Sequence, residues 1–274
     1  MCKRALGHWL GAMTLLCAGV VGAQNAAAPA QSAFGPGEQS TYRVSYLGVV
    51  AGSATITVGA ETRQWGQIVL PIVTVARSES MFDLYPIRDK FVSYWSHAEE
   101  RCIGSDLYAD ENRVKRRQRI RFDHEAKKAT VIQQKEGSDE KVSTHEVAEG
   151  AFDIASATFA LRNRPLEVGR VYELPVFTGS RSFTLRATVK SRQVLDTPLG
   201  KKEVFKVLVQ TGFAGKLQSR RDLHAYFTAD EDRIPVRIDA EFVLGTITAE
   251  LVDYKSGRRY ALRPQPSGAE GTGG

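Results

Sequence analysis

Apolar side chains recur at every second position through most of the chain, which is the period of a half-buried β-strand. Residues 42–46 and 54–58 alternate in this way, and Gly48 and Gly52 between them suit a hairpin connection. The same pattern predicts further strands at 68–76, 88–96, 106–108, 113–122, 129–134, 170–177, 182–194, 201–211, 223–228, 236–244 and 246–254. Strands at this regular spacing predict an all-β fold: a strongly curved antiparallel meander or open barrel.

One segment breaks the strand pattern, "AFDIASATFALRNRPLEVG" at residues 151–169. Asp153 can cap a helix there, and Pro165 lies just beyond the point where that helix would end. The predicted apolar face, at spacings of three and four, consists of Ile154, Ala157, Thr158 and Leu161. We expect one short helix at 153–163 that plugs or flanks the sheet.

The N-terminus has the features of a secretory signal peptide. Two basic residues precede an apolar stretch at 5–22, and small side chains surround a cleavage point after Ala23. The alternative is a lipoprotein anchored at Cys17, but Leu16 occupies a position that usually holds a small residue. We therefore expect export to the periplasm as residues 24–274, with lipid anchoring as the less favoured alternative.

Composition predicts one domain with flexible ends. The segment 24–39 and the tail 256–274 are rich in small and polar residues, which bury too little apolar surface to offset ordering entropy. Residues 40–255 form the predicted β-rich domain. Removing Lys3 and Arg4 with the signal lowers the formal charge from +6 to 6 − 2 = +4, which does not indicate a nucleic-acid-binding protein.

Residues 113–122, "RVKRRQRIRF", carry a dense basic run. In a strand, Arg116 points to one face, and successive side chains on the other face stand about 7 Å apart. That second face holds the ladder Arg113, Lys115, Arg117, Arg119 and Arg121. The ladder is either solvated and neutralised by the acids at 99–111, or a contact for an anionic envelope surface such as lipid head groups.

No motif predicts catalytic or metal chemistry. His97 and His145 lie near glutamates, but neither belongs to a His-x-x-x-His or Cys-x-x-Cys spacing. The mature chain keeps one cysteine, Cys102, so it has no intramolecular disulfide, and no nucleophile elbow of the Gly-x-Ser-x-Gly type occurs. The sequence therefore predicts no metal, no cofactor and no catalytic residues.

The stretch "MFDLYPIRDKFVSYWS" at 81–96 is rich in large apolar groups for a strand and its preceding connection. Such groups are either core, or the rim of a ligand cavity enclosed by the sheet, or a partner contact. The candidates for a cavity rim are Met81, Phe82, Tyr85, Tyr94 and Trp95.

Five segments, in this order, resemble the bacterial exported proteins of domain-of-unknown-function family 3108 over about residues 40–255. They are "YRVSYLGVVAGSATITV", "LYPIRDKFVSYWS", "FDIASATFALRNRPLEVG", "VLDTPLGKKEVFKV" and "DEDRIPVRIDAEFVLGTITAEL". The third segment departs from the family, which usually has Asp-Pro at its start and aromatic residues inside, where this chain has "FDIASATFALR". Asp153, Ser156, Leu161 and Arg162 still match the family pattern. The resemblance implies a strand-rich envelope protein and supplies no catalytic residues.

These observations favour a non-enzymatic periplasmic protein that binds an amphiphilic small molecule or lipid in a cavity of the sheet. A second hypothesis is an envelope assembly factor that docks protein partners through a strand edge or the 81–86 connection. A third is a hydrolase acting on cell-wall or lipid substrates, which needs an acid–base cluster in a cleft. Peripheral membrane contact is compatible with the first two.

Overall fold

The computed structural model describes residues 31–79, 86–111, 114–213, 216–217, 223–242 and 245–262. The first nine strands are β1 (Gln39–Tyr46), β2 (Val49–Val58), β3 (Thr62–Gln64), β4 (Gln67–Ser78), β5 (Arg88–Ser96), β6 (Arg101–Glu111), β7 (Val114–Asp123), β8 (Lys128–Lys135) and β9 (Lys141–Glu146). After helix α1 (Ile154–Arg162) follow β10 (Val171–Phe177), β11 (Ser182–Thr197), β12 (Gly200–Phe213), β13 (Lys216–Leu217), β14 (Leu223–Thr228), β15 (Pro235–Phe242) and β16 (Gly245–Lys255).

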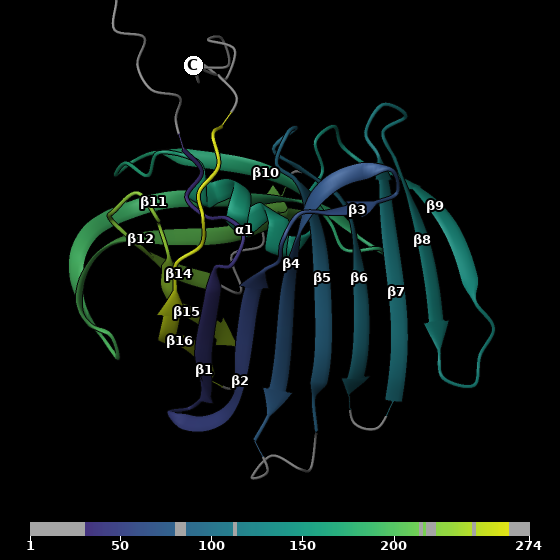
Figure 1. The fold of residues 1–274 in the computed structure, drawn as a ribbon. Helices are drawn as coiled ribbons and strands as arrows, with labels where there is room; N and C mark the ends of the chain where they lie inside the picture. Colours follow the sequence, from purple (N-terminus) through teal and green to yellow (C-terminus); the bar gives the residue numbers. More distant parts are fainter. Residues whose placement is uncertain are drawn as a thin grey trace, which may run out of the picture.

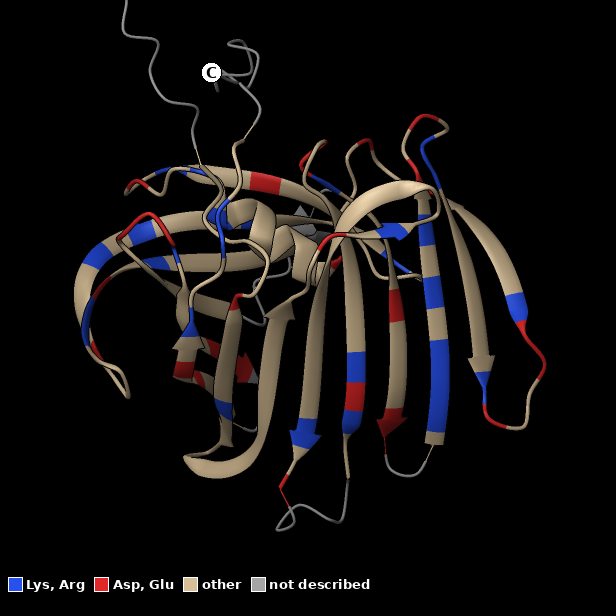
Figure 2. Ribbon diagram, viewed as in Figure 1, with Lys and Arg blue, Asp and Glu red and all other residues tan. Residues whose placement is uncertain are grey.

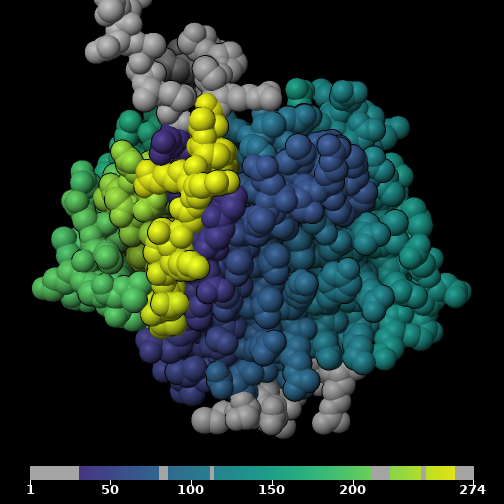
Figure 3. Space-filling view, viewed as in Figure 1, coloured from purple at the N-terminus to yellow at the C-terminus, as the bar shows by residue number. Residues whose placement is uncertain are grey.

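The strands form one antiparallel sheet in the order β10-β11-β12-β14-β15-β16-β1-β2-β4-β5-β6-β7-β8-β9, with β3 and β13 paired at its margins. The first and last strands of the chain are neighbours, and they lie side by side in the space-filling view (Figure 3). In Figure 1, β1 to β9 run up and down while β10 to β12 cross at a large angle, and α1 lies between these two arms. The predicted all-β class with an antiparallel meander and one short helix is confirmed.

The two ends of this strand order, β9 and β10, share no backbone pairing among the described residues. Their side chains nevertheless meet, because the rings of His145 and Phe177 lie 5.4 Å apart. The free side of β10 is covered by Phe152, which exchanges backbone hydrogen bonds with Pro175 and Phe177. The seam is therefore closed by packing and by the segment that leads into α1.

Helix α1 begins where the sequence predicts. Asp153 is its N-cap and accepts a hydrogen bond from the Ser156 amide at 2.8 Å, while the Ser156 hydroxyl accepts one from the Asp153 amide at 3.0 Å. This reciprocal arrangement is a capping box, which satisfies two backbone donors at the helix start. Asn163 caps the other end, two residues before Pro165.

Residues 31–38 differ from the prediction of a flexible leader. Phe34 is 1% exposed and packs edge-on against Phe159 of α1, with ring centroids 4.6 Å apart. Glu38 is also buried, and it forms an ion pair with Arg162. The composition argument failed because one aromatic ring and one buried ion pair anchor an otherwise small and polar segment.

The start of the predicted flexible tail is likewise packed. Tyr260 accepts a hydrogen bond from the Trp95 indole at 2.9 Å and its ring lies edge-on to Phe34. Arg259 pairs with Glu231 and Asp232, in the turn between β14 and β15. The chain therefore remains ordered for several residues after β16, up to at least 262.

Two strands depart from the sequence prediction for opposite reasons. β6 extends over Arg101–Glu111 rather than 106–108, because Gly104 and Ser105 are small and interrupt the alternation of large apolar and polar side chains. β9, "KVSTHE", was not predicted because it has a single large apolar residue, Val142, which is 63% exposed. It is an edge strand, and its backbone pairing with β8 defines it.

Candidate functional site

A cavity of about 490 Å³ lies between α1 and the inner face of the sheet. Its walls come from β1, β2, β4, β5, β6, β7, β10, β15 and β16, and α1 closes one side. Most of its lining is apolar: Ala54, Ile56, Phe91, Leu107, Ile120, Ile154, Phe159, Phe177, Ile238 and Ala249. The strand alternation explains this lining, because each wall strand contributes alternate side chains to the same face.

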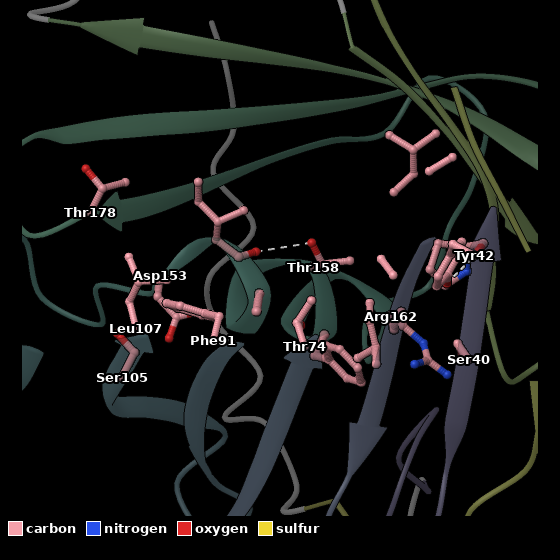
Figure 4. Close-up of a pocket in the computed structure, with 18 of the residues that line it drawn as sticks. Ser40, Tyr42, Thr74, Phe91, Ser105, Leu107, Asp153, Thr158, Arg162 and Thr178 are labelled. Carbon is pink, nitrogen blue, oxygen red and sulfur yellow. Dashed lines mark hydrogen bonds between the residues drawn. The ribbon is translucent and has the colours of Figure 1, made fainter. Parts of the chain in front are cut away.

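The two ends of the cavity differ in their polar groups (Figure 4). Arg162 lies beside Ser40 and Tyr42 at one end, and Asp153 lies with Ser105 near the other. The middle is crossed by Thr158, whose hydroxyl donates to the Ile154 carbonyl within α1 at 3.2 Å.

The Arg162 end is closed and fully paired. The guanidinium is 1% exposed and binds the Glu38 carboxylate through both terminal nitrogens, at 2.6 and 3.1 Å. Its remaining donors reach the carbonyls of Ala33 and Asp232. Its charged plane also lies over Phe159, 5.1 Å from the ring centroid. Arg162 thus joins α1, the N-terminal segment and the β14–β15 turn, and each of its three guanidinium nitrogens has a protein acceptor.

Tyr42 is a second closed polar group at this end. Its hydroxyl donates to the Pro235 carbonyl at 2.9 Å, and burial raises its pKa, so it remains a neutral phenol. It therefore presents mainly its apolar ring to the cavity.

Asp153 is a buried carboxyl group that lines the cavity without a basic partner among the described residues. Its Oδ1 accepts the Ser156 amide and its Oδ2 accepts the Cys102 thiol at 3.1 Å. Burial raises the pKa of this carboxyl, while the hydrogen bonds from Ser156, Ser93 and Cys102 oppose that shift. The carboxyl group therefore caps the helix and also borders the cavity, where it can contact a bound ligand.

Three neutral polar side chains face the cavity with no hydrogen bond to another described residue: Thr74, Ser105 and Gln118. They come from β4, β6 and β7, on the same inner face as the apolar lining. An otherwise apolar pocket with a few available polar groups is typical of small-molecule binding sites.

The described titratable groups do not form a catalytic arrangement. Cys102 is buried, does not line the cavity, and has a pKa raised by burial and by Asp153, so it remains a thiol. His124 approaches the Cys102 carbonyl at 2.6 Å, and burial lowers its pKa. Among the described residues, no three His, Cys, Asp or Glu side chains are grouped as a metal site would require.

The predicted rim residues are only partly placed. Met81, Phe82 and Tyr85 lie outside the described residues. Tyr94 and Trp95 do not line the cavity, which corrects the prediction for these two. Tyr94 is on the outer face and donates to Asp106 at 2.8 Å, whereas Trp95 is 1% exposed and stacks on Phe152 in the core.

Trp95 shares the inner face of β5 with Phe91, but it lies farther along the strand, where Phe34 and Phe152 pack against it. The cavity instead receives Phe91 from the same strand. Of the strand 54–58, Ala54 and Ile56 line the cavity, and of the predicted apolar helix face, Ile154 and Thr158 do so.

The basic ladder lies on the outer face of β7, and Figure 2 shows it as a column of basic positions beside acidic ones on β6. Arg113 lies outside the described residues. Arg119 pairs with Asp106 at 2.8 Å, and Lys115 lies 3.9 Å from Glu136. Arg117 and Arg121 lie over the rings of Tyr108 and Trp65. Each described residue of the ladder thus contacts an acidic side chain or an aromatic ring of the protein. Contact of the ladder with an anionic surface stays a prediction.

No helix among the described residues combines the length and apolar character needed to cross a membrane.

Together, the single antiparallel sheet, the helix packed on it and the apolar cavity between them define an all-β protein with a ligand-sized internal space. The chain belongs to the family described as Protein of unknown function (DUF3108), whose model matches residues 41–252. The resemblance seen in the sequence is therefore confirmed. No match was found among curated proteins.

Solved structures support the fold. The chain is similar to a β-barrel-like protein of the domain of unknown function DUF1849 from Brucella abortus, with a TM-score of 0.55 and 10% identity. That similarity covers 82% of this chain and 99% of the other.

Two further structures are more distant. One is a protein of Bacteroides fragilis provisionally described as exported and of YmcC-like fold (TM-score 0.35, 10% identity, covering 84% and 100% of the two chains). The other is a protein of Parabacteroides distasonis provisionally described as a lipoprotein (TM-score 0.32, 9% identity, covering 82% and 99%). Neither of these carries an argument about this chain.

Proposed function

We propose that this protein is exported to the periplasm and binds a small molecule with a long apolar part in the cavity under α1. The observation that carries the proposal is the cavity itself, about 490 Å³ of mostly apolar space with three available polar groups. Its volume falls within the range of roughly 300–1,000 Å³ typical of small-molecule sites.

The packing around the cavity supports a preformed site. α1 cannot settle onto the sheet and fill the space easily, because Arg162 fixes its C-terminal end and the hydrogen bond from the Cys102 thiol of β6 to Asp153 holds its start. A rigid, preformed pocket reduces the ordering entropy that a ligand must overcome.

Apolar lining also favours an aliphatic ligand over a polar one. Each methylene moved from water into such a space contributes about 0.8 kcal/mol, or about fourfold in Kd. Removing water from Ser105 or Gln118 without replacing a hydrogen bond opposes binding, so the ligand also needs a polar group. These two requirements describe an amphiphile.

The signal-peptide pattern of residues 1–23 supports export. Amphiphiles such as fatty acids and lipids are abundant in the envelope, and they need a protein carrier or sensor to leave the membrane for an aqueous compartment. The proposed location and the proposed ligand class are therefore compatible.

The test uses displacement of N-phenylnaphthylamine, a neutral fluorescent probe, by an alkyl series of increasing chain length. The proposal predicts saturable binding and a Kd that falls about fourfold for each added methylene until the cavity is filled. Ala54→Leu, which adds volume to the cavity wall, is expected to weaken binding at least tenfold.

The matched control is Thr55→Leu, on the same strand but with its side chain on the opposite face. It is expected to bind like the wild type. No saturable binding by the wild type, or equal loss in both variants, contradicts the proposed cavity. Native mass spectrometry of protein purified from the periplasm then identifies what the cavity carries in cells.

A further inference from the structure

A second hollow, of about 440 Å³, adjoins the apolar cavity at Leu107 and Gln118, which line both. It lies on β6, β7 and β8, toward the ends of these strands marked by Glu111, Val114 and Lys135. Its character differs from that of the first, because charged and amide side chains replace most of the apolar ones.

The inner face of β7 changes from apolar to charged along its length. Ile120 lies within the apolar cavity, Gln118 lies at the junction, and Arg116 lines the second hollow. The paired positions on β8 change in parallel: Val131 is opposite Ile120, Gln133 opposite Gln118, and Lys135 opposite Arg116. Directly opposed residues share a face of the sheet, so the polarity gradient belongs to the surface and not to one strand.

On the inner face, the second hollow is lined by two basic residues, Arg116 and Lys135, and one acidic residue, Glu111, while Arg117, which also borders it, directs its guanidinium over Tyr108 on the outer face. Glu111 is already engaged by Arg116 at 3.0 Å, which holds the guanidinium in place and leaves some of its donors open. Lys135 forms no ion pair with another described residue. The hollow therefore carries an excess of positive charge next to an apolar space.

A further acidic group lies behind this site. Asp89 on β5 accepts the Asp110 amide at 3.1 Å, and it does not line the hollow. Burial raises its pKa, as do the hydrogen bond and the charge of the neighbouring Glu111, while the nearby Arg116 opposes this shift. Lys135, on the far side of Arg116, remains the cation most available to a ligand.

We propose that the ligand is a long-chain amphiphile with one anionic head group, a carboxylate or a phosphate monoester. Its chain occupies the apolar cavity and its head group lies between Lys135 and Arg116, with the amides of Gln118 and Gln133 as further donors. This proposal rests on the proposed function, and it adds the charge and the orientation of the ligand.

The test compares four ligands of equal chain length below their micelle concentrations: dodecanoate, dodecyl phosphate, dodecanol and dodecyltrimethylammonium. Each displaces the neutral probe from the wild type, from Lys135→Gln and from Arg116→Gln/Lys135→Gln. The control is Lys128→Gln, which removes the same charge from the opposite end and opposite face of the same strand.

The wild type is expected to prefer an anionic ligand over dodecanol by about fivefold, the effect of one partly exposed ion pair. Lys135→Gln is expected to lose most of that preference, and the double variant to lose all of it, while dodecanol binds all variants equally. The better of the two anions, carboxylate or phosphate, identifies the head group. Lys128→Gln behaves like the wild type.

The outcomes separate the two proposals. Failure of all four ligands to displace the probe overturns the proposed function. Equal binding of dodecanol and the anions, unaffected by Lys135→Gln, leaves the cavity standing and overturns the head-group site. Preference for dodecyltrimethylammonium overturns it too, because Glu111 is the acidic side chain of the hollow that would bind a cationic head group.

Discussion

Arg162 and Arg116 both project into the space enclosed by the sheet, and their surroundings give them different roles. Arg162 is 1% exposed, and Glu38, Ala33 and Asp232 together accept all its hydrogen bonds. Arg116 is 52% exposed and has one carboxylate partner, Glu111. A buried arginine whose three nitrogens all have protein acceptors holds the fold together, whereas an exposed one with open donors is available to a ligand.

The same contrast applies to the two ends of the enclosed space. Around Arg162, three chain segments are bound together, and Phe34, Phe159 and Tyr260 fill the gaps between them. Around Arg116, the inner face opens into a hollow lined by charged and amide groups. Polarity on an inner face therefore indicates a ligand site only where the polar groups lack partners from the protein.

The largest expected effect comes from Arg162→Met, which tests whether the closed end is structural. It leaves the Glu38 carboxylate buried without a partner, and we expect a loss of about 3–5 kcal/mol in the free energy of unfolding. Urea unfolding followed by tryptophan fluorescence measures it. The double variant Arg162→Met/Glu38→Met is expected to recover much of the loss. A loss below about 1 kcal/mol in the single variant would contradict the structural role.

Phe34→Ala tests the same end without a change of charge. The ring contacts Trp95, Phe159 and Tyr260, so its removal leaves a cavity, and we expect a cost of about 3–5 kcal/mol. A conservative Phe34→Leu change is expected to cost less because it retains most of the buried volume. Unchanged stability of the alanine variant would mean that residues 31–38 do not pack as described.

Asp153→Asn tests the buried carboxyl that lies at the border of the cavity. Burial raises the Asp153 pKa in the folded state, so its contribution to stability is present below the unfolded pKa of about 3.9 and is lost as pH rises through the folded value. Asparagine also caps helices well but does not titrate.

Between pH 4 and pH 7, we expect the free energy of unfolding of Asp153→Asn to rise relative to that of the wild type by on the order of 1 kcal/mol. Urea unfolding at several pH values checks it. A difference between the two proteins that does not change with pH would show that the carboxyl titrates normally in the folded state.

The smallest effect belongs to Arg119→Gln, on the outer face of the strand that carries Arg116. The Arg119–Asp106 pair is partly exposed, and Tyr94 still donates to Asp106 in the variant, so we expect a cost of about 1 kcal/mol or less. Lys115→Gln is the control, because its pair is longer and more exposed, and its expected cost is near zero. A cost above about 3 kcal/mol for Arg119→Gln would give the outer ladder a structural role comparable with that of Arg162.

Strand periodicity was enough to predict the fold class and most strands, because burying one face of an antiparallel sheet requires apolar and polar residues to alternate along each strand. It also placed Arg116 on the opposite face from the ladder, which is the orientation that the head-group proposal requires. The helix could be predicted because Asp153, the apolar spacing and Pro165 are all local signals.

The closed end could not be predicted from local patterns. Glu38 and Arg162 are far apart in the sequence, and neither has neighbours that indicate burial. Phe34 lies in a segment whose average composition resembles that of a linker. A single aromatic residue changes this average little, so composition did not predict that Phe34 anchors the segment. Trp95 was misplaced because alternation along β5 gives only its face, whereas its contacts with Phe34 and Phe152, distant in the sequence, remove it from the cavity lining.

The most direct test of the central claim is a methyl-labelled NMR titration of the isoleucine side chains with dodecanoate. Ile56, Ile120, Ile154 and Ile238 line the cavity, whereas Ile68 and Ile247 do not and are exposed elsewhere. The account predicts saturable shifts of the first group with little change in Ile68 and Ile247. Shifts confined to Ile68 and Ile247, or none at a saturating ligand concentration, would contradict a ligand site inside the sheet.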